Sequence, residues 1–205
     1  MLINGSQRAN GCTHRALQEI ERTLNQAGIE TEILHIGAKA VQGCTSCGAC
    51  SGGKPCVFDG EDEIVTIARG KLNEADALIV GSPVYFASPN GNLIAFLDRL
   101  FYGNVNCANK PAAAIASARR AGTTATLDVL NKYFIICGMP IVPSQYWCMV
   151  HGNEPEEVEK DLEGLQIMRT LGRNMAWLLK CIEAGRNAGI NPPEREKRVS
   201  TNFIR

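Results

Sequence analysis

The sequence has no excess of charge, no long apolar segment and few histidines. Lysine and arginine together number 21, as do aspartate and glutamate, so the formal net charge at pH 7 is zero. A chain without a net electrostatic field is not expected to bind nucleic acid or an anionic membrane. Its apolar runs are all too short to cross a bilayer, so we expect no membrane segment. Three histidines, far apart along the chain, do not suggest a joint metal site.

Patterns typical of hydrolytic catalysis and of export are missing as well. No Ser-His-Asp or paired-carboxylate arrangement can be argued from the spacing of these residues, so we assign no catalytic acid or base. The chain begins without a charged leader followed by an apolar segment, from which we expect a cytoplasmic protein. Nine cysteines, an odd number, would then lie in a reducing compartment, where thiols serve more often as ligands or reactive groups than as disulfides.

What the sequence does contain is a regular alternation of apolar runs and helical patterns. With 205 residues, of which 45% are hydrophobic, the chain can bury one good core and is expected to form one domain. The predicted strands are 2–3, 30–36, 77–80, 112–116 and 139–142, and the predicted helices are 13–27, 61–73, 93–101, 123–134 and 155–184. Strands that alternate with helices predict a parallel sheet covered on both faces.

The loops after the strands are where a ligand is expected. Right-handed crossovers bring these loops together at the carboxyl edge of the sheet, and ligands bind there at the point where the strand order reverses. The loops to examine are 4–12, 43–58, 82–92 and 117–122. We expect all of them, the cysteine loop 43–58 included, to lie on this one edge.

Four cysteines in the cysteine loop stand in the spacing C-x2-C-x2-C-x5-C, at Cys44, Cys47, Cys50 and Cys56. Glycines between them allow the backbone to fold tightly around one centre. A four-iron cluster takes four thiolate ligands, which makes a 4Fe–4S cluster the leading interpretation. Zinc in a four-thiolate site is an alternative, although its usual pattern is two separated C-x2-C pairs. A disulfide, or thiols without any ligand, is the other alternative.

The first loop has the features of a phosphate site. It leads directly into a helix, whose open N–H groups and positive dipole end attract an anion. Ser6, Asn10 and Thr13 can donate hydrogen bonds from their side chains, and Arg8 adds a charge. The loop is neither a G-x-G-x-x-G dinucleotide motif nor a Walker motif, so a monophosphate is favoured. The alternative is that Thr13 only caps the helix.

The second and third loops are suited to a flat ring. Two prolines stiffen the second loop, and the adjacent aromatic residues Tyr85 and Phe86 lie where a chain normally becomes polar. They could hold a heteroaromatic ring, or simply cover the end of the sheet. In the third loop, Arg119 and Arg120 place two cations beside the site. A solvated helix start is the alternative for these two residues.

These motifs together resemble the NADPH-dependent FMN reductase family of flavodoxin-like proteins and, within it, the iron–sulfur flavoproteins. The resemblance covers roughly residues 1–149, with weaker matches at 171–173 and 201–205. It rests on Gly5-Ser6-x-Arg8-x-x-Gly11-x-Thr13, the four-cysteine loop, Ala75-Asp76, Gly81-Ser82-Pro83-Val84-Tyr85-Phe86 and Leu97-Asp98-Arg99. Where members of the family commonly have Asn, this chain has Cys12, and where they commonly have Lys it has Ile94.

The resemblance implies a fold and a cofactor site. The expected fold is a flavodoxin-like α/β/α sandwich with a five-stranded parallel sheet in the order 2-1-3-4-5, binding FMN between its first and third strands. The residues implied to bind the phosphate of FMN belong to the first loop and are Ser6, Arg8, Asn10, Cys12 and Thr13. Those implied to lie against the isoalloxazine ring are Pro83, Val84, Tyr85 and Phe86, with Asn90 nearby. Those implied to lie at the polar edge of the ring are Ser117, Arg119 and Gly122.

From this we expect an FMN-dependent oxidoreductase. Electrons from NAD(P)H or a ferredoxin would pass through the flavin to a small acceptor such as a quinone or a free flavin. A non-enzymatic electron carrier with flavin and cluster is the first alternative, and a zinc-stapled binding module without flavin is the second.

We expect two parts in the chain, a domain over 1–190 and a C-terminal arm over 191–205. Pro192 and Pro193 stiffen the start of the arm, and the apolar pair Phe203-Ile204 stands near its end. Members of the family are commonly dimers or tetramers. We therefore expect a homodimer or homotetramer in which this arm packs on a second subunit near its flavin edge.

Overall fold

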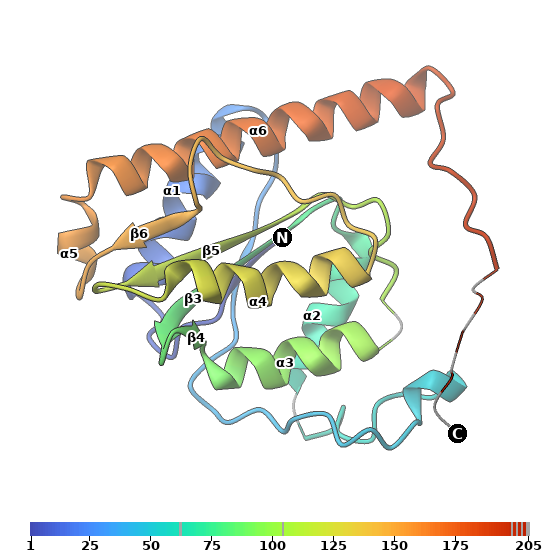
Figure 1. Ribbon diagram of the computed structural model, residues 1–205. Coiled ribbons are helices and arrows are strands. Elements are labelled where there is room, and N and C mark those ends of the chain that lie inside the picture. Colours follow the sequence, from blue (N-terminus) through green and yellow to red (C-terminus); the bar gives the residue numbers. More distant parts are fainter. Residues whose placement is uncertain (62, 104, 198, 200, 202, 204–205) are drawn as a thin grey trace.

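The chain folds into a sheet between two layers of helices (Figure 1). This computed structural model describes residues 1–61, 63–103, 105–197, 199, 201 and 203. The strands are β1 (Leu2–Asn4), β2 (Ile33–His35), β3 (Leu78–Tyr85), β4 (Ser88–Pro89), β5 (Ala112–Ala118) and β6 (Met149–His151). The helices are α1 (Cys12–Gln26), the 3-10 turn η1 (Cys50–Gly52), α2 (Glu63–Glu74), α3 (Gly91–Tyr102), α4 (Thr123–Ile136), α5 (Pro155–Val158) and α6 (Leu162–Asn187).

The sheet has the strand order β2-β1-β3-β5-β6, and these strands are parallel. The short strand β4 pairs antiparallel with the end of β3. This arrangement confirms the predicted flavodoxin-like fold, in which the strand order reverses between β1 and β3. The reversal opens a crevice at the carboxyl ends of these two strands.

The helices cover both faces of the sheet. Figure 1 shows α1 and α6 packed together on one face, while α3 and α4 cover the other, with α2 packed against α3. Strand β5 has the sequence AAAIASA and is buried along its whole length, so its small side chains let helices approach the sheet from both sides. One continuous apolar core results.

A buried carboxylate joins the two helices of the first layer. Glu19 of α1 is 1% exposed and accepts hydrogen bonds from Arg22 at 2.6 Å, Arg169 of α6 at 2.7 Å and Arg15 at 3.1 Å. Burial alone would raise the pKa of Glu19, but the hydrogen bonds from Arg169 and Arg15 outweigh burial and hold the pKa below its ordinary value. The contact therefore keeps Glu19 ionised inside the helix pair.

The predicted fifth strand at 139–142 is wrong. Ile141 forms only an isolated bridge with Ala112, whereas the edge strand is β6, where Met149 pairs with Ala116. If the parallel pairing of Ile141 with Ala112 continued without a break, the partner of Ala116 would be the residue four positions before Met149. The actual partner of Ala116 is Met149, so the two pairings belong to different registers. Pro140 and Pro143 flank Ile141, and because proline lacks an N–H group it cannot continue a ladder of hydrogen bonds.

Two further boundaries differ from the prediction. The helix expected over 155–184 is divided into α5 and α6 at Asp161, whose carboxylate accepts hydrogen bonds from the N–H of Gly164 at 2.9 Å and of His151 at 2.6 Å. Asp161 therefore begins a new helix and ties it to β6. Strand β3, expected to end at Val80, continues to Tyr85.

The cysteine loop does not lie on the edge where it was expected. After β2, the segment 39–42 is held along α3 by two side chains of that helix. The side chain of Asn92 accepts from Val41 N at 2.7 Å and donates to Lys39 O at 3.1 Å. Further along the helix, Arg99 Nη1 donates to Gln42 O at 3.3 Å. The cysteines are thereby carried to the far end of α3, where η1 lies in Figure 1, away from β4. A helix of twelve residues is about 18 Å long.

Candidate functional site

The loop after β1 is shaped by a side chain at the end of that strand. Asn4 is fully buried; its Nδ2 donates to Ala9 O at 3.0 Å and its Oδ1 accepts from Ser6 N at 3.1 Å. Ser6 Oγ then accepts from Arg8 N at 3.1 Å, and His35 Nε2 lies 2.8 Å from Ser6 O. The loop is therefore held in place before any ligand arrives.

The N-terminus of α1 is open toward this loop. Its N-cap residue is Gly11, no side chain caps the helix, and the first turn has no acidic residue. Arg8 and Asn10 are exposed beside it, and Ser6 is buried beneath. Free N–H groups at the positive end of a helix are a site for an anion of the size of a phosphate group.

The first loop is joined to the loops after β5 and β6. Thr13 Oγ1 lies 2.8 Å from Ser117 Oγ, so this hydroxyl does not cap α1. Cys12 Sγ donates to Gly152 O at 3.5 Å. Burial raises the pKa of the Cys12 thiol, which favours the protonated donor form. Gly81 makes this junction possible, because a Cβ atom there would lie 2.8 Å from Thr13 Cγ2.

The second loop is a tight hairpin between β3 and β4. Its two turn residues, Phe86 and Ala87, have φ angles of +50° and +55°. Such values suit the primed turns of hairpins but are unfavourable for residues other than glycine, and strain of this kind is concentrated at functional sites. The side chain of Phe86 is fully exposed, so it does not cover the end of the sheet.

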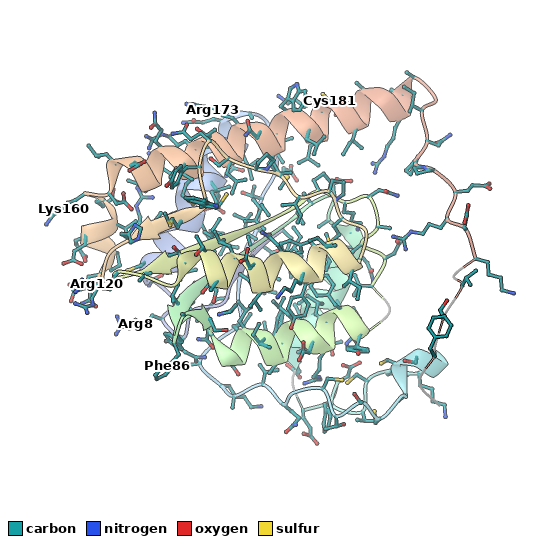
Figure 2. The ribbon with its side chains drawn as sticks, in the orientation of Figure 1. Arg8, Phe86, Arg120, Lys160, Arg173 and Cys181 are labelled. Atoms are coloured by element: carbon teal, nitrogen blue, oxygen red, sulfur yellow. The ribbon has the colours of Figure 1, made fainter. Side chains whose placement is uncertain are left out.

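The second loop touches the third loop at Gly122. This residue has a φ of +91°, and a Cβ atom on it would lie 2.7 Å from Ala87 Cα and 2.9 Å from Val84 Cγ1. Figure 2 shows Arg8, Phe86 and Arg120 at the same edge of the molecule, where the strands end. The three predicted loops therefore converge on one site, as the strand order predicted.

Asn90 carries a polar group with no partner in the described part of the chain. The residue is 2% exposed; its Oδ1 accepts from Asn92 N at 2.7 Å and caps α3, while its Nδ2 is buried without a hydrogen bond. A buried donor without a partner is costly unless a ligand satisfies it. This donor, the open end of α1 and the exposed Arg119 fit the heteroaromatic ring and phosphate of FMN.

The four cysteines of the cysteine loop line one cavity of about 200 Å³, together with Phe58, Arg99 and Tyr102. Gly48 and Gly53 turn the backbone there with φ angles of +77° and +78°, and Ser46 N donates to Cys44 Sγ at 3.5 Å. All nine cysteines lie within the described residues and none of them is paired in a disulfide, so the disulfide considered above does not form in this structure.

The four thiols share one cavity, but within the described residues they do not gather around a single point. Within the described ranges, no three His, Cys, Asp or Glu side chains converge closely enough to hold one metal ion. A single zinc ion needs its four ligands around one point. A four-iron cluster carries its thiolates at separate corners, so thiols spaced around a cavity fit it.

Sequence reasoning missed three residues of the site, Asn4, His35 and Gly152. Asn4 and His35 end neighbouring strands and shape the phosphate loop. The signal that could have revealed them is a polar residue at the end of each apolar strand. Gly152 was missed because the fifth strand was placed too early in the chain. A larger cavity of about 600 Å³, lined in part by Leu24, Asp76 and Met175, lies at the opposite edge of the sheet and includes none of the predicted site residues.

A flavodoxin-like sheet with its site at the switch point defines the class of this protein, and comparisons with known proteins agree. A flavodoxin from the domain Archaea superposes with a TM-score of 0.60 at 16% identity, covering 87% of this chain and 96% of that one. FerB, an NAD(P)H:(acceptor) oxidoreductase from Paracoccus denitrificans, superposes with a TM-score of 0.61 at 17% identity, over 88% and 96% of the two chains. At these identities the likeness establishes the fold.

The family follows from sequence. The family model described as NADPH-dependent FMN reductase matches residues 1–154. An iron–sulfur flavoprotein of Methanocaldococcus jannaschii is 32% identical over 192 residues, which cover 88% of this chain and 97% of that protein. The chain belongs to the NADPH-dependent FMN reductase family, whose members are FMN-dependent oxidoreductases. In the described part of the chain, no helix is both long and apolar enough to span a membrane.

Proposed function

We propose that this protein takes electrons from NAD(P)H or a reduced ferredoxin and passes them through FMN to a small acceptor such as a quinone or a free flavin. The observation that carries this proposal is the convergence of three loops at the switch point, next to the open N-terminus of α1. FMN, when bound, supplies the electron-transfer chemistry, so no protein acid or base is required.

The roles of the residues follow from their positions. Ser6, Arg8 and the first N–H groups of α1 bind the phosphate, with Cys12 and Thr13 holding that loop to its neighbours. The side-chain amide of Asn90 donates to the ring, because it has no other acceptor among the described residues. Arg119 supplies positive charge at the polar edge of the ring, which favours its reduced, anionic form.

The four cysteines hold a 4Fe–4S cluster in this proposal. Their common cavity supports it, as does the name of the relative from Methanocaldococcus jannaschii. The nine cysteines, none of which forms a disulfide in the described structure, are typical of a reducing compartment, which supports a cytoplasmic location.

A homodimer or homotetramer forms part of the proposal. The cysteine cavity and the flavin loops of one chain lie at opposite ends of α3, about 18 Å of helix apart. A second subunit that brings its flavin loops to this cavity would shorten the path for electrons.

The visible spectrum of anaerobically purified protein tests the proposal. We expect flavin bands together with a broad cluster absorption, and iron and sulfide at four atoms of each per chain, as a 4Fe–4S cluster requires. Replacing the four cysteines with serine should remove the cluster absorption and leave the flavin bands. A colourless protein would contradict the flavin, and flavin bands alone would contradict the cluster.

Turnover assays separate the enzyme from an electron carrier. Oxidation of NADH or NADPH with a quinone or free flavin as acceptor is the expected result. Reduction by ferredoxin, with no turnover of a small acceptor, would instead identify a carrier between partner proteins.

A further inference from the structure

A buried arginine lies on the wall of the cysteine cavity. Arg99 is 1% exposed and belongs to the last turn of α3. Among the described residues that line the cavity it is the only one with a permanent charge, the others being cysteines and uncharged side chains. Arginine is almost never fully buried without a specific reason, because removing its charge from water is costly.

Among the described residues, the guanidinium of Arg99 is held by one neighbour just before the cysteine loop, one at its end and one just after it. Its Nη1 donates to Gln42 O at 3.3 Å, and its Nη2 lies 3.7 Å from a carboxylate oxygen of Asp59. Its Cζ atom also lies 5.4 Å from the centre of the Phe58 ring, which is a cation–π distance. A charge held from several directions in this way keeps a constant position relative to the cavity.

Asp59 links Arg99 to a second arginine and to the cysteine loop. Asp59 also accepts a hydrogen bond from Arg69 Nη1 at 2.8 Å and one from Cys56 N at 3.2 Å. The guanidinium groups of Arg69 and Arg99 therefore both lie against this carboxylate. The same carboxylate accepts from the backbone of Cys56, so the charge of Arg99 is tied to the cysteine loop.

We propose that Arg99 is a positioning residue that sets the reduction potential of the cluster through its buried positive charge. This inference rests on the cluster of the proposed function. Four thiolates in one cavity repel one another, and a one-electron reduction adds one further negative charge among them. A fixed cation in a partly desolvated cavity stabilises this added charge strongly, so Arg99 raises the potential.

A purely structural role is the competing explanation. Arg99 also holds the segment before the cysteine loop to α3, and a cation in the last turn of a helix is favourable in itself. Loss of such a role would destabilise the protein and reduce its iron content. A purely structural role would not cause the reduction potential to shift in one direction when the positive charge of Arg99 is removed and in the other direction when the negative charge of Asp59 is removed.

The test compares four variants of the anaerobically purified protein: Arg99→Met, Arg99→Lys, Asp59→Asn and Arg173→Met. Arg173 is exposed on α6 (Figure 2), so its variant controls for the same change in net charge. The midpoint potential is measured by a dithionite titration followed by electron paramagnetic resonance. Iron and sulfide per chain, and the melting temperature of the iron-free protein, report on structural damage.

We expect Arg99→Met to disfavour reduction about tenfold, which is about 59 mV for a one-electron couple. Asp59→Asn should shift the potential upward, Arg99→Lys should retain most of the native value, and Arg173→Met should leave it unchanged. If Arg99→Met fails to retain iron, an iron-replete Asp59→Asn protein with the native potential would still overturn the inference, because Asp59 is the carboxylate paired with Arg99. If the Arg99→Met and Asp59→Asn proteins contain the full amount of iron and both keep the native potential, this inference is overturned while the proposed cluster stands. A native protein without iron and sulfide would overturn the proposed cluster, and this inference with it.

Discussion

The hydroxyl oxygens of Thr13 and Ser117 lie 2.8 Å apart, although 104 positions separate the two residues in the chain. Both side chains are buried, at 1% and 5% exposure. The bond joins the start of α1 to the end of β5, so the phosphate loop and the loop proposed to contact the ring move as one body. Either hydroxyl can be the donor, which leaves the other hydrogen available for a ligand.

Removing the donors of the phosphate loop should release FMN. Ser6→Ala combined with Arg8→Ala removes a hydroxyl and a positive charge from the loop. Each charge-assisted hydrogen bond is worth roughly 1.5–3 kcal/mol, so affinity should fall by about two to four decades. Fluorescence titration of the apoprotein with FMN measures the change. Gln18→Ala, on the exposed surface of α1, is the control, and an unaltered affinity in the double variant would place the phosphate elsewhere.

Adding a methyl group at Gly122 should disturb the junction of the second and third loops. The positive φ of Gly122 and the 2.7 Å approach to Ala87 Cα make Gly122→Ala destabilising by about 1–3 kcal/mol. Urea unfolding measures the loss, and FMN affinity should fall in parallel. Gly70→Ala is the matched control: Gly70 lies exposed in α2 with open space around it, so alanine there should stabilise by about 0.5–1 kcal/mol. Equal effects at the two positions would refute the contact.

Glu19 should make the stability of the fold depend on pH in the acid range. Because the folded-state pKa of Glu19 is below its ordinary value of 4.5, its contribution is complete above that value and is lost as the pH falls through the folded-state pKa. Glu19→Gln should cost about 1.5–3 kcal/mol at neutral pH and should flatten the acid limb of the stability curve.

Urea midpoints at neutral pH and at several values below 4.5 measure this dependence. The control is Glu30→Gln, because Glu30 is exposed. An acid limb that is the same in native protein and Glu19→Gln would show that another group controls acid stability.

The C-terminal arm should contribute to assembly. Val199 and Phe203 are 88% and 92% exposed, and the arm follows the end of α6 that lies far from β6 and the flavin loops of the same chain (Figure 1). Within the described part of the arm, Arg195 donates to Cys137 O at 3.2 Å. Ile204, the other half of the predicted apolar pair, lies outside the described residues.

We expect removal of residues 191–205 to lower the oligomeric state or weaken flavin retention, because exposed apolar side chains such as Phe203 gain most by packing on a neighbour. Sedimentation velocity and the ratio of flavin to protein measure the two effects. Phe203→Ser should reproduce part of the change. A truncated protein with native sedimentation and flavin content would leave the arm without this role.

Local patterns in the sequence determined much of this protein. The alternation of apolar runs with helical periods was sufficient to predict the parallel sheet, because each pattern reflects which faces of an element are buried. The strand order was implied by the family resemblance of the motifs. The spacing of Cys44, Cys47, Cys50 and Cys56 predicted a common site, and the structure places all four on one cavity. The loop before α1 predicted an open helix end beside polar side chains, since this feature depends only on neighbouring residues.

Other features were decided only by tertiary contacts. The edge strand is β6 rather than 139–142, because prolines interrupt the ladder of hydrogen bonds beside β5. Which segment pairs with β5 is therefore decided by hydrogen bonds between strands and not by the apolar pattern of one segment. The cysteine loop lies at the far end of α3 because Asn92 and Arg99 bind the segment that leads to it. Strand order predicts where a loop begins, but the path of a long loop is set by the side chains of the helix it packs against.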